Sequence, residues 1–470
     1  MAQEYKEKLE LFFEKNRQQM IEDICRLVKI PSVGADPLPG KPYGKTAAKA
    51  LEEALKMAEE KGFAVKDYDH YVGAVDFCEE PTQLAILAHL DVVPEGTGWQ
   101  VTKPYEPVMI ENRLYGRGTS DDKGPAIAAL YAMMAVKELG ITLHKNVRLL
   151  LGTDEERGSS DLKHYFSIEK APPMSFSPDA WYPVINIEKG GLHSTFHAEW
   201  AEETALPRLI SLESGTTGNI VPREGTALLE GLEKSLVAEH CKAFAEKSGV
   251  LFTITEENGK LRIDALGEGA HASMPEKGKN AAQALAELIA GLPLADSASF
   301  RALKNFAALF PYGDYYGKSI GVAQQDDVSG VLTLNIGIFK MDLTSISGKI
   351  DSRTPICANE QNMSKVVEAK LAKCGIHLDT TAMNPPHHTD ADSPLVKTLL
   401  QIYEEYTGRK GECIAIGGGT YVHHIEGGVA FGCGFPEEDN HEHGADEFVN
   451  IDQLLLSAKM FAEAIIKLCA

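Results

Sequence analysis

Cysteine is scarce in this sequence and follows no recognisable pattern. There are eight cysteines in 470 residues, scattered along the chain and without a C-x-x-C pair. Small secreted domains built on disulfides and zinc sites built on cysteines are therefore excluded. The beginning of the chain is charged and lacks the apolar core of a signal peptide. Together these features favour a reducing compartment, and we expect a cytoplasmic protein.

Long apolar runs and excess positive charge are also missing. No run approaches the ~18 residues of a membrane span, so we expect no membrane partner. There are 46 Lys and Arg against 68 Asp and Glu, which gives a formal net charge of −22. Nucleic-acid binding requires basic surface that neutralises phosphates, so we expect no nucleic-acid partner. Hydrophobic residues make up 44% of the chain and charged residues 24%, which is typical of a folded protein of two or three domains.

A recurring unit organises both ends of the chain: a short apolar run followed directly by acidic or histidine residues. Such runs occupy 84–88, 147–151, 174–177 and 429–432, and helical patterns separate them. Alternation of this kind predicts an α/β fold in which a mostly parallel twisted sheet is flanked by helices. Ligands collect beyond the carboxyl ends of parallel strands. The polar residues after these runs are therefore candidates for a functional site.

The middle of the chain has a different pattern. Strand-like stretches lie at 192–199, 226–230, 250–255, 261–265 and 331–339, with helices near 233–247, 280–291 and 360–373. This mixture predicts an inserted α+β lid domain with an antiparallel sheet. We therefore expect residues 1–186 and 381–470 to form one catalytic domain, with residues 187–380 inserted into it.

The polar residues at the predicted strand ends suit a hydrolytic metal site. A lone His or Asp after a strand is more often a cap or turn residue, but several suitable donors at several strand ends favour zinc, or manganese or cobalt. With one carboxylate shared, five ligands can hold two metals. Asp91 lies two residues beyond His89 and can accept its second ring N–H, and Glu155 is free to take a proton. The set is His89, Asp91, Asp121, Glu155, Glu156, Asp179 and His443.

Several longer motifs resemble a known family. They are HLDVVP at 89–94, YGRGTSDDKG at 115–124, DEE at 154–156, SPDA at 177–180, GAHAS at 269–273, IGGGTY at 416–421 and HGADEF at 443–448. Together they are similar to the di-zinc metallopeptidases of the aminoacylase, carnosinase and dipeptidase group. The triple glycine and the segment SPDAWYP are most similar to its PepV-type bacterial dipeptidases. The resemblance covers nearly the whole chain.

The resemblance implies a role for each matching residue. One metal would be bound by His89 and Asp179, the other by Glu156 and His443, and Asp121, rather than Asp122, would bridge them. Glu155 would be the general base, Asp91 would support His89, and His271 would steady the oxyanion. The substrate would be contacted by Asn219, Arg353, Gly417, Gly418, Gly419 and Thr420, of which the last four would offer backbone amides to a carboxylate.

Three assignments have competing interpretations in the sequence. His441 is a second candidate for the last ligand, and only the GADEF that follows favours His443. Arg353 is alternatively a surface arginine, and His271 is alternatively a residue at the start of a helix.

The function implied by this resemblance is hydrolysis of dipeptides with the help of two divalent ions, zinc first and manganese or cobalt second. The substrate partner would be a small peptide. An N-acyl amino acid amidohydrolase would use the same centre, and a catalytically silent homologue that only binds metal is a further alternative. The long insert could cap the site within one chain, so we favour a monomer over a dimer.

Overall fold

The computed structural model describes residues 2–470, with side chains from Tyr5 onward, and its backbone forms two compact units. The first unit comprises the described residues up to Ile187, together with His387–Ile414 and Gly419–Ala470. The second comprises Glu188–Pro386 and Ala415–Gly418. Among the described helices, none combines the length and the apolar character that a membrane-spanning helix requires.

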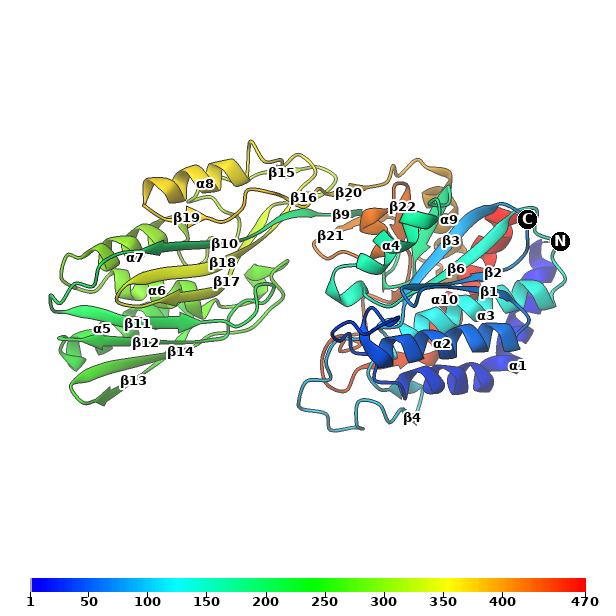
Figure 1. Cartoon of the computed structure of the whole chain (residues 1–470), viewed down its shortest axis with the longest axis horizontal. Helices are drawn as coiled ribbons and strands as arrows, with labels where there is room; N and C mark the ends of the chain where they lie inside the picture. The colour runs from blue at the N-terminus through cyan, green and yellow to red at the C-terminus, as the bar shows by residue number, and fades with distance from the viewer. Residues whose placement is uncertain (1) are drawn as a thin grey trace. The chain divides into compact units, whose positions relative to one another are not determined.

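The first unit is built on a twisted sheet whose centre is parallel (Figure 1). Neighbouring strands β6, β3, β7 and β22 run parallel, whereas β1 and β2 add an antiparallel edge and β9 pairs antiparallel with β22. Along the sheet the order is β1 (Ala64–Tyr68), β2 (Val72–Asp76), β6 (Asn146–Gly152), β3 (Thr82–His89), β7 (Met174–Ser177), β22 (Gly428–Ala430), β9 (Val184–Glu188) and β20 (His387–His388). The chain passes from the first unit into the second within β21 (Cys413–Ile416).

Helices with apolar faces cover this sheet. They are α1 (Ala2–Val28), α2 (Gly44–Glu60), α3 (Lys123–Glu138), α4 (Ser160–Ile168), α9 (Pro394–Thr407) and α10 (Ile451–Cys469), with the 3₁₀ turns η1 (Glu155–Arg157) and η3 (Tyr421–His424). Helix α3 is rich in alanine and almost entirely buried, and it packs against α1, α10 and β3. Its small side chains let neighbouring elements approach closely, which fixes the helix end that follows Asp121.

Two small sheets complete the first unit. One has the order β24 (Phe448–Asn450), β5 (Arg113–Tyr115) and β4 (Val108–Ile110), and all its pairs are antiparallel. The other pairs β23 (Cys433–Gly434) with β8 (Ala180–Trp181). The first of these sheets joins the segment just before Asp121 to the segment just after His443, although they are far apart in the sequence.

The second unit is an antiparallel sheet with helices packed on it. Its order is β13 (Leu251–Glu257), β14 (Lys260–Leu266), β12 (Glu224–Glu230), β11 (Arg208–Ser214), β17 (Thr333–Met341), β18 (Ser345–Thr354), β10 (Gly190–Glu199) and β19 (His377–Leu378). The remaining elements are α5 (Lys234–Ser248), α6 (Ala281–Ala290), α7 (Ala298–Leu309), α8 (Ser364–Lys373), η2 (Pro275–Lys277) and the hairpin β15 (Gln325–Asp326) with β16 (Gly330–Val331). Helix α6 packs on β11, β12 and β17, and its apolar face belongs to this unit's core.

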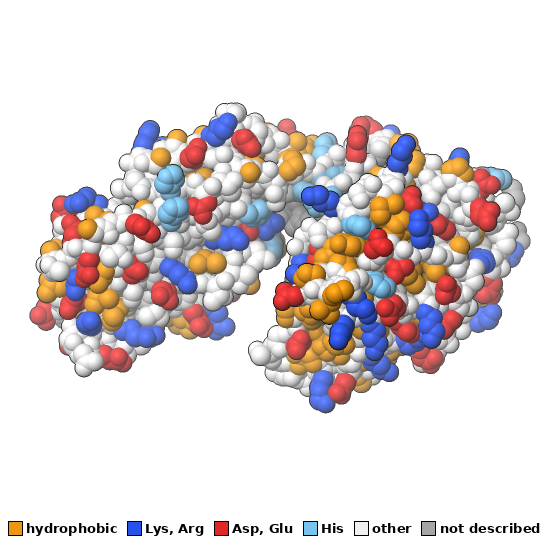
Figure 2. All heavy atoms as spheres, viewed as in Figure 1, with side chains coloured by type: hydrophobic (Ala, Val, Ile, Leu, Met, Phe, Trp, Pro, Cys, Tyr) orange, Lys and Arg blue, Asp and Glu red, His pale blue; other side chains and the backbone are white. Residues whose placement is uncertain are grey.

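The predicted fold class is confirmed: one part is α/β with parallel central strands, and the other is α+β with an antiparallel sheet. The sequence patterns did not predict β11, β18 or α7. In β18 buried positions such as Ile346 and Ile350 alternate with partly exposed polar residues, so this strand offers no continuous apolar run. Figure 2 shows basic side chains interspersed with acidic ones on the visible faces of both units.

Candidate metal centre

The carboxyl ends of the central strands deliver polar side chains to one edge of the first unit's sheet. His89 is the last residue of β3, and Asp179 follows β7 by two residues. Glu155 and Glu156 begin η1, just beyond β6. Because neighbouring parallel strands end at the same edge, these side chains converge. Asp121 reaches the same place from the loop that precedes α3.

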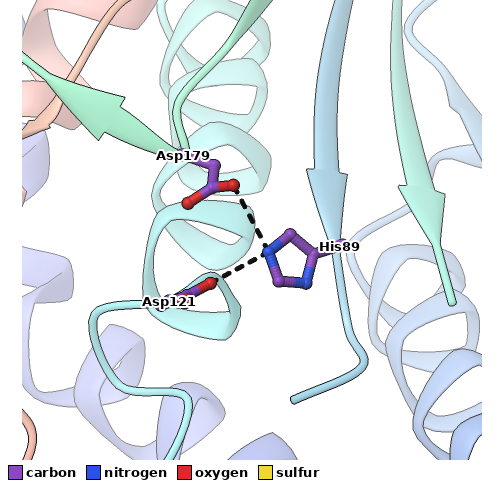
Figure 3. Close-up of side chains that lie close together, drawn as sticks. All are labelled: His89, Asp121 and Asp179. Atoms are coloured by element: carbon purple, nitrogen blue, oxygen red, sulfur yellow. Dashed lines mark ion pairs between the residues drawn. The ribbon is translucent and has the colours of Figure 1, made fainter. Parts of the chain in front are cut away.

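Two groups of donor atoms lie at this edge and share one carboxylate. In the first group, His89 Nε2 is 3.0 Å from Asp121 Oδ1 and 3.4 Å from Asp179 Oδ2, so both carboxylates face the same ring nitrogen (Figure 3). In the second, His443 Nε2 is 2.8 Å from Asp121 Oδ2 and 3.2 Å from Glu156 Oε1. The donor atoms of each group lie within 4.8 Å of one another, which is close enough to hold a metal ion.

Two buried atoms of these groups test whether a metal fits. His89 Nε2 and Glu156 Oε1 are both inaccessible to solvent, and in the described part of the chain neither makes a hydrogen bond of good geometry, although each faces a donor atom of its own group. Leaving a buried polar atom without a partner is costly. One imidazole and two carboxylates in each group are donors that zinc and other first-row divalent ions accept. The residues therefore fit a divalent cation in both groups.

The carboxylates of the site are desolvated and repel one another, and only the two histidines offset this in the absence of a cation. Burial raises the pKa of Glu156 to about 7, and the nearby Asp121 charge adds to this effect. Burial also tends to raise the pKa of Asp121, but the nearby rings of His443 and His89 hold it below its usual range. The pKa of His443 rises to about 11 because the carboxylates of Asp121 and Glu156 lie close to its ring. Removing carboxylates from water favours their neutral form, and a divalent cation would offset this.

Asp91 organises the residues around His89 and Glu155. His89 Nδ1 lies 3.1 Å from the carbonyl oxygen of Asp91 and 3.4 Å from its carboxylate. The same carboxylate accepts the backbone N–H groups of Glu155 at 3.2 Å and of Glu156 at 3.1 Å. Asp91 thus contacts the histidine ring mainly through its carbonyl group, while its side chain fixes the start of η1.

Glu155 is deeply desolvated next to the donor groups. Burial raises its pKa well above the usual value, and the charges of Asp179, Glu156 and Asp91 raise it further, whereas that of His89 opposes them. A carboxylate with a raised pKa is a stronger base than an exposed one. The side chain is therefore suited to accept a proton beside the donor groups.

Two alternatives left by the sequence are separated by this geometry. Asp122 Oδ2 accepts the backbone N–H of His89 at 3.0 Å, and this residue belongs to neither donor group. His441 places its ring 5.8 Å from that of Phe448, and it also belongs to neither group. The donor groups contain Asp121 and His443 instead.

Residues 85–467 match the model of peptidase family M20/M25/M40. The chain belongs to this family. It is 35% identical over 461 residues to the protein named "Putative dipeptidase YtjP" of Bacillus subtilis (strain 168), covering 97% of this chain and 98% of the relative. It is 34% identical over 432 residues to the Beta-Ala-Xaa dipeptidase of Lactobacillus delbrueckii subsp. lactis, covering 91% and 90%. The fold resembles that of human carnosine dipeptidase 1, with a TM-score of 0.62 at 16% identity and 98% coverage of both chains.

Membership of this peptidase family makes the chain a hydrolase, and it confirms the resemblance that the motifs indicated. Two substrate-contact candidates of this peptidase, His271 and Asn219, are adjacent in the second unit. The ring of His271 is 2.6 Å from Ser273 Oγ, and its backbone bridges to Ile220, next to Asn219. The carbonyl oxygen of Asn219 accepts the N–H of Ala272 at 2.9 Å. These contacts hold the two segments side by side.

Arg353 and the glycine-rich turn are also adjacent in the second unit of this peptidase. Arg353 Nε lies 2.8 Å from Asp351, and its Nη1 donates to the carbonyl oxygen of Gly417 at 2.6 Å. Gly418 follows in the same unit, whereas Gly419 and Thr420 belong to the first unit. Thr420 caps η3, and its hydroxyl accepts the N–H of Val422.

Sequence reasoning gave no role to four buried residues that lie near the two donor groups of this peptidase. Tyr421 donates its hydroxyl hydrogen to Asp161, which also accepts the N–H of Thr153 at 2.7 Å. Arg117 and Glu447 form an ion pair that is almost fully buried. Three of the four residues lie inside the family motifs, and Asp161 lies outside them. The sequence does not show which residues pair, because each pair joins positions far apart in the chain.

Proposed function

We propose that this chain is a dipeptidase that holds two divalent ions. His89 and Asp179 would bind one ion, Glu156 and His443 the other, and Asp121 both. The observation that carries the proposal is the position of Asp121, whose two carboxylate oxygens face two different histidines at 3.0 and 2.8 Å. The dipeptidase names of relatives that share about a third of the sequence over more than nine tenths of the chain support the substrate class.

The bound ions would polarise the scissile carbonyl group and make a water molecule more acidic. Glu155 would take a proton from the attacking water and later deliver it to the leaving amine. Its raised pKa supports the second transfer as well as the first, because a higher pKa stabilises the protonated form that returns the proton. Asp91 would keep Glu155 in place through the backbone N–H groups at the start of η1.

Residues of the second unit would bind and orient the substrate. His271 would steady the oxyanion, a contribution of about 3 kcal/mol for a well-placed donor. Arg353 and the glycine-rich turn at 417–420 would receive the substrate carboxylate, and Asn219 would contact the substrate nearby. The direct contact between Arg353 and Gly417 supports a shared role for these two elements. We propose zinc as the metal, with manganese and cobalt as alternatives, and a monomeric enzyme.

A substrate panel combined with metal analysis tests this proposal. The purified protein should contain about two equivalents of a divalent metal, cleave dipeptides with free amino ends, and lose this activity after chelation. Readdition of zinc, manganese or cobalt should restore it and identify the preferred ion. The rival function is N-acyl amino acid hydrolysis by the same centre. Faster cleavage of N-acetylated amino acids than of dipeptides would refute the dipeptidase proposal.

A further inference from the structure

Two segments that carry donor residues are joined by a buried ion pair. One segment, 116–121, ends at Asp121, and the other, 443–447, begins at His443. Arg117 Nη1 donates to Glu447 Oε2 at 2.6 Å, and the two side chains are only 1% and 0% exposed. The pair links residues 330 positions apart in the sequence. Charged hydrogen bonds are strong at such a desolvated position.

Glu447 fixes the backbone of the segment that carries Asp121. Its carboxylate accepts the N–H groups of Gly118 at 3.0 Å, of Ser120 at 3.0 Å and of Asp121 itself at 3.2 Å. Gly118 has a φ of +87°, in the left-handed region that glycine adopts readily. This conformation lets successive N–H groups converge on one anion. The orientation of Asp121 therefore depends on a carboxylate supplied by the other segment.

Arg117 fixes the segment that carries His443 in return. Its Nη2 donates to the carbonyl oxygen of Gly444, the residue after His443, at 2.9 Å. Each segment thus contributes one charged side chain that holds the backbone of the other beside a donor residue. We refer to this pair and its backbone contacts as the Arg117–Glu447 clasp.

We propose that Arg117 and Glu447 are positioning residues that set the metal affinity of the group Asp121, Glu156 and His443, an inference that rests on the metal binding of the proposed function. Two of the three donors of this group lie on the clasped segments. In the other group, which consists of His89, Asp121 and Asp179, only Asp121 lies on a clasped segment. The clasp therefore acts on the two groups unequally, which a general contribution to stability would not do.

Cobalt(II) titration of the metal-free full-length protein tests this asymmetry. In a His89→Ala background the clasped group remains, and adding Glu447→Gln should weaken cobalt binding by about 10- to 100-fold, as loss of partners of ligating residues commonly does. In a His443→Ala background the other group remains, and the same addition should weaken cobalt binding clearly less, because only Asp121 of its three donors lies on a clasped segment. Equal weakening in both backgrounds, or no weakening in either, overturns the proposal.

A matched control separates positioning from stability. Asp23 is another fully buried carboxylate of the first unit, bound by Lys61 at 2.6 Å and by the Tyr131 hydroxyl at 2.7 Å. Asp23→Asn and Glu447→Gln should both lower the unfolding temperature, but only Glu447→Gln should lower cobalt affinity. If Asp23→Asn weakens cobalt binding as much, the proposal is wrong.

Arg117→Lys is the variant to use in the same titration if Glu447→Gln does not fold. Lysine keeps a charge for Glu447 but lacks the planar fork that also reaches the Gly444 carbonyl group. In the His89→Ala background the substitution should weaken cobalt binding relative to His89→Ala alone, and by more than it does in the His443→Ala background. Unchanged affinity overturns the reciprocal role of Arg117. Failure of the unmodified chain to cleave dipeptides while it still binds cobalt would refute the proposed function without affecting this result.

Discussion

The two units of the molecule treat buried charge in opposite ways. In the described part of the second unit, Glu188 and Asp351 are the only buried charged side chains. The core between its sheet and its helices is apolar. The first unit buries a much larger set: Asp23, His89, Asp91, Arg117, Asp121, Asp122, Lys123, Asp154, Asp161, Glu447 and Glu463. Burying a charge is expensive unless it is paired or binds a metal. The unit with more buried charge is also the one that carries both donor groups.

Sheet architecture accounts for this difference. The central strands of the first unit are covered on both faces, so they are largely apolar and most ionisable residues collect where the parallel strands end. In the second unit, antiparallel strands such as β18 alternate buried and partly exposed residues, which places charge along the solvent side of each strand. Charge is thus concentrated at one edge of the first sheet and dispersed over the second.

Glu155→Gln should give the largest functional loss in the first unit. Glutamine retains the shape of the side chain but cannot accept and return a proton, so turnover should fall by about 10²- to 10⁴-fold. Metal content should remain that of the unmodified protein, because Glu155 belongs to neither donor group. Steady-state kinetics and metal analysis measure both quantities, with the exposed Glu138→Gln as control. Undiminished turnover would refute the assignment of Glu155 as the base.

Removal of the metal ions should lower the local stability of the first unit and leave that of the second unit unchanged. A ligand at 100 times its dissociation constant stabilises the folded state by about 2.7 kcal/mol, and chelation removes this contribution only where the ion binds. Amide hydrogen exchange should accelerate in peptides covering η1, the end of β3 and the His443 segment, and it should stay constant in β17 and β18. Equal acceleration in both units would contradict a metal site confined to the first.

Part of this arrangement could be predicted from sequence because it depends on local patterns. Short apolar runs followed by His89, Glu156 and Asp179 indicated both the parallel strands and the edge where the donors meet. The pairing of Arg117 with Glu447 could not be predicted, since it joins residues 330 positions apart and each alone resembles a surface charge. The backbone contacts of the Asp91 carboxylate depend on the local path of η1 and leave no pattern in the sequence.

Arg353→Met should affect binding more than chemistry. If Arg353 receives the substrate carboxylate, its loss removes an interaction present in both the ground state and the transition state, so KM should rise by about tenfold with kcat nearly unchanged. Methionine retains most of the apolar volume of the side chain while removing the hydrogen bonds to Asp351 and Gly417. A dipeptide amide, which lacks the carboxylate, should show no such difference. A fall in kcat at constant KM would contradict a binding role.

Asp326→Asn should have the smallest effect of these substitutions, and the quantity that it changes is stability. It tests the contribution of a charge that lies on the second unit, outside the donor groups. Burial alone would raise the pKa of Asp326, but hydrogen bonds from Ser329 and from the N–H of Cys357 lower it to about 2. Because the folded pKa lies below the usual 3.8, its stabilising contribution is complete above that pH and is lost as pH falls through about 2. The substitution should cost on the order of 1 kcal/mol near pH 6. Amide exchange of the β15–β16 hairpin should show this difference shrinking as the pH is lowered toward 2, whereas a constant difference would mean that the carboxylate charge is not its source.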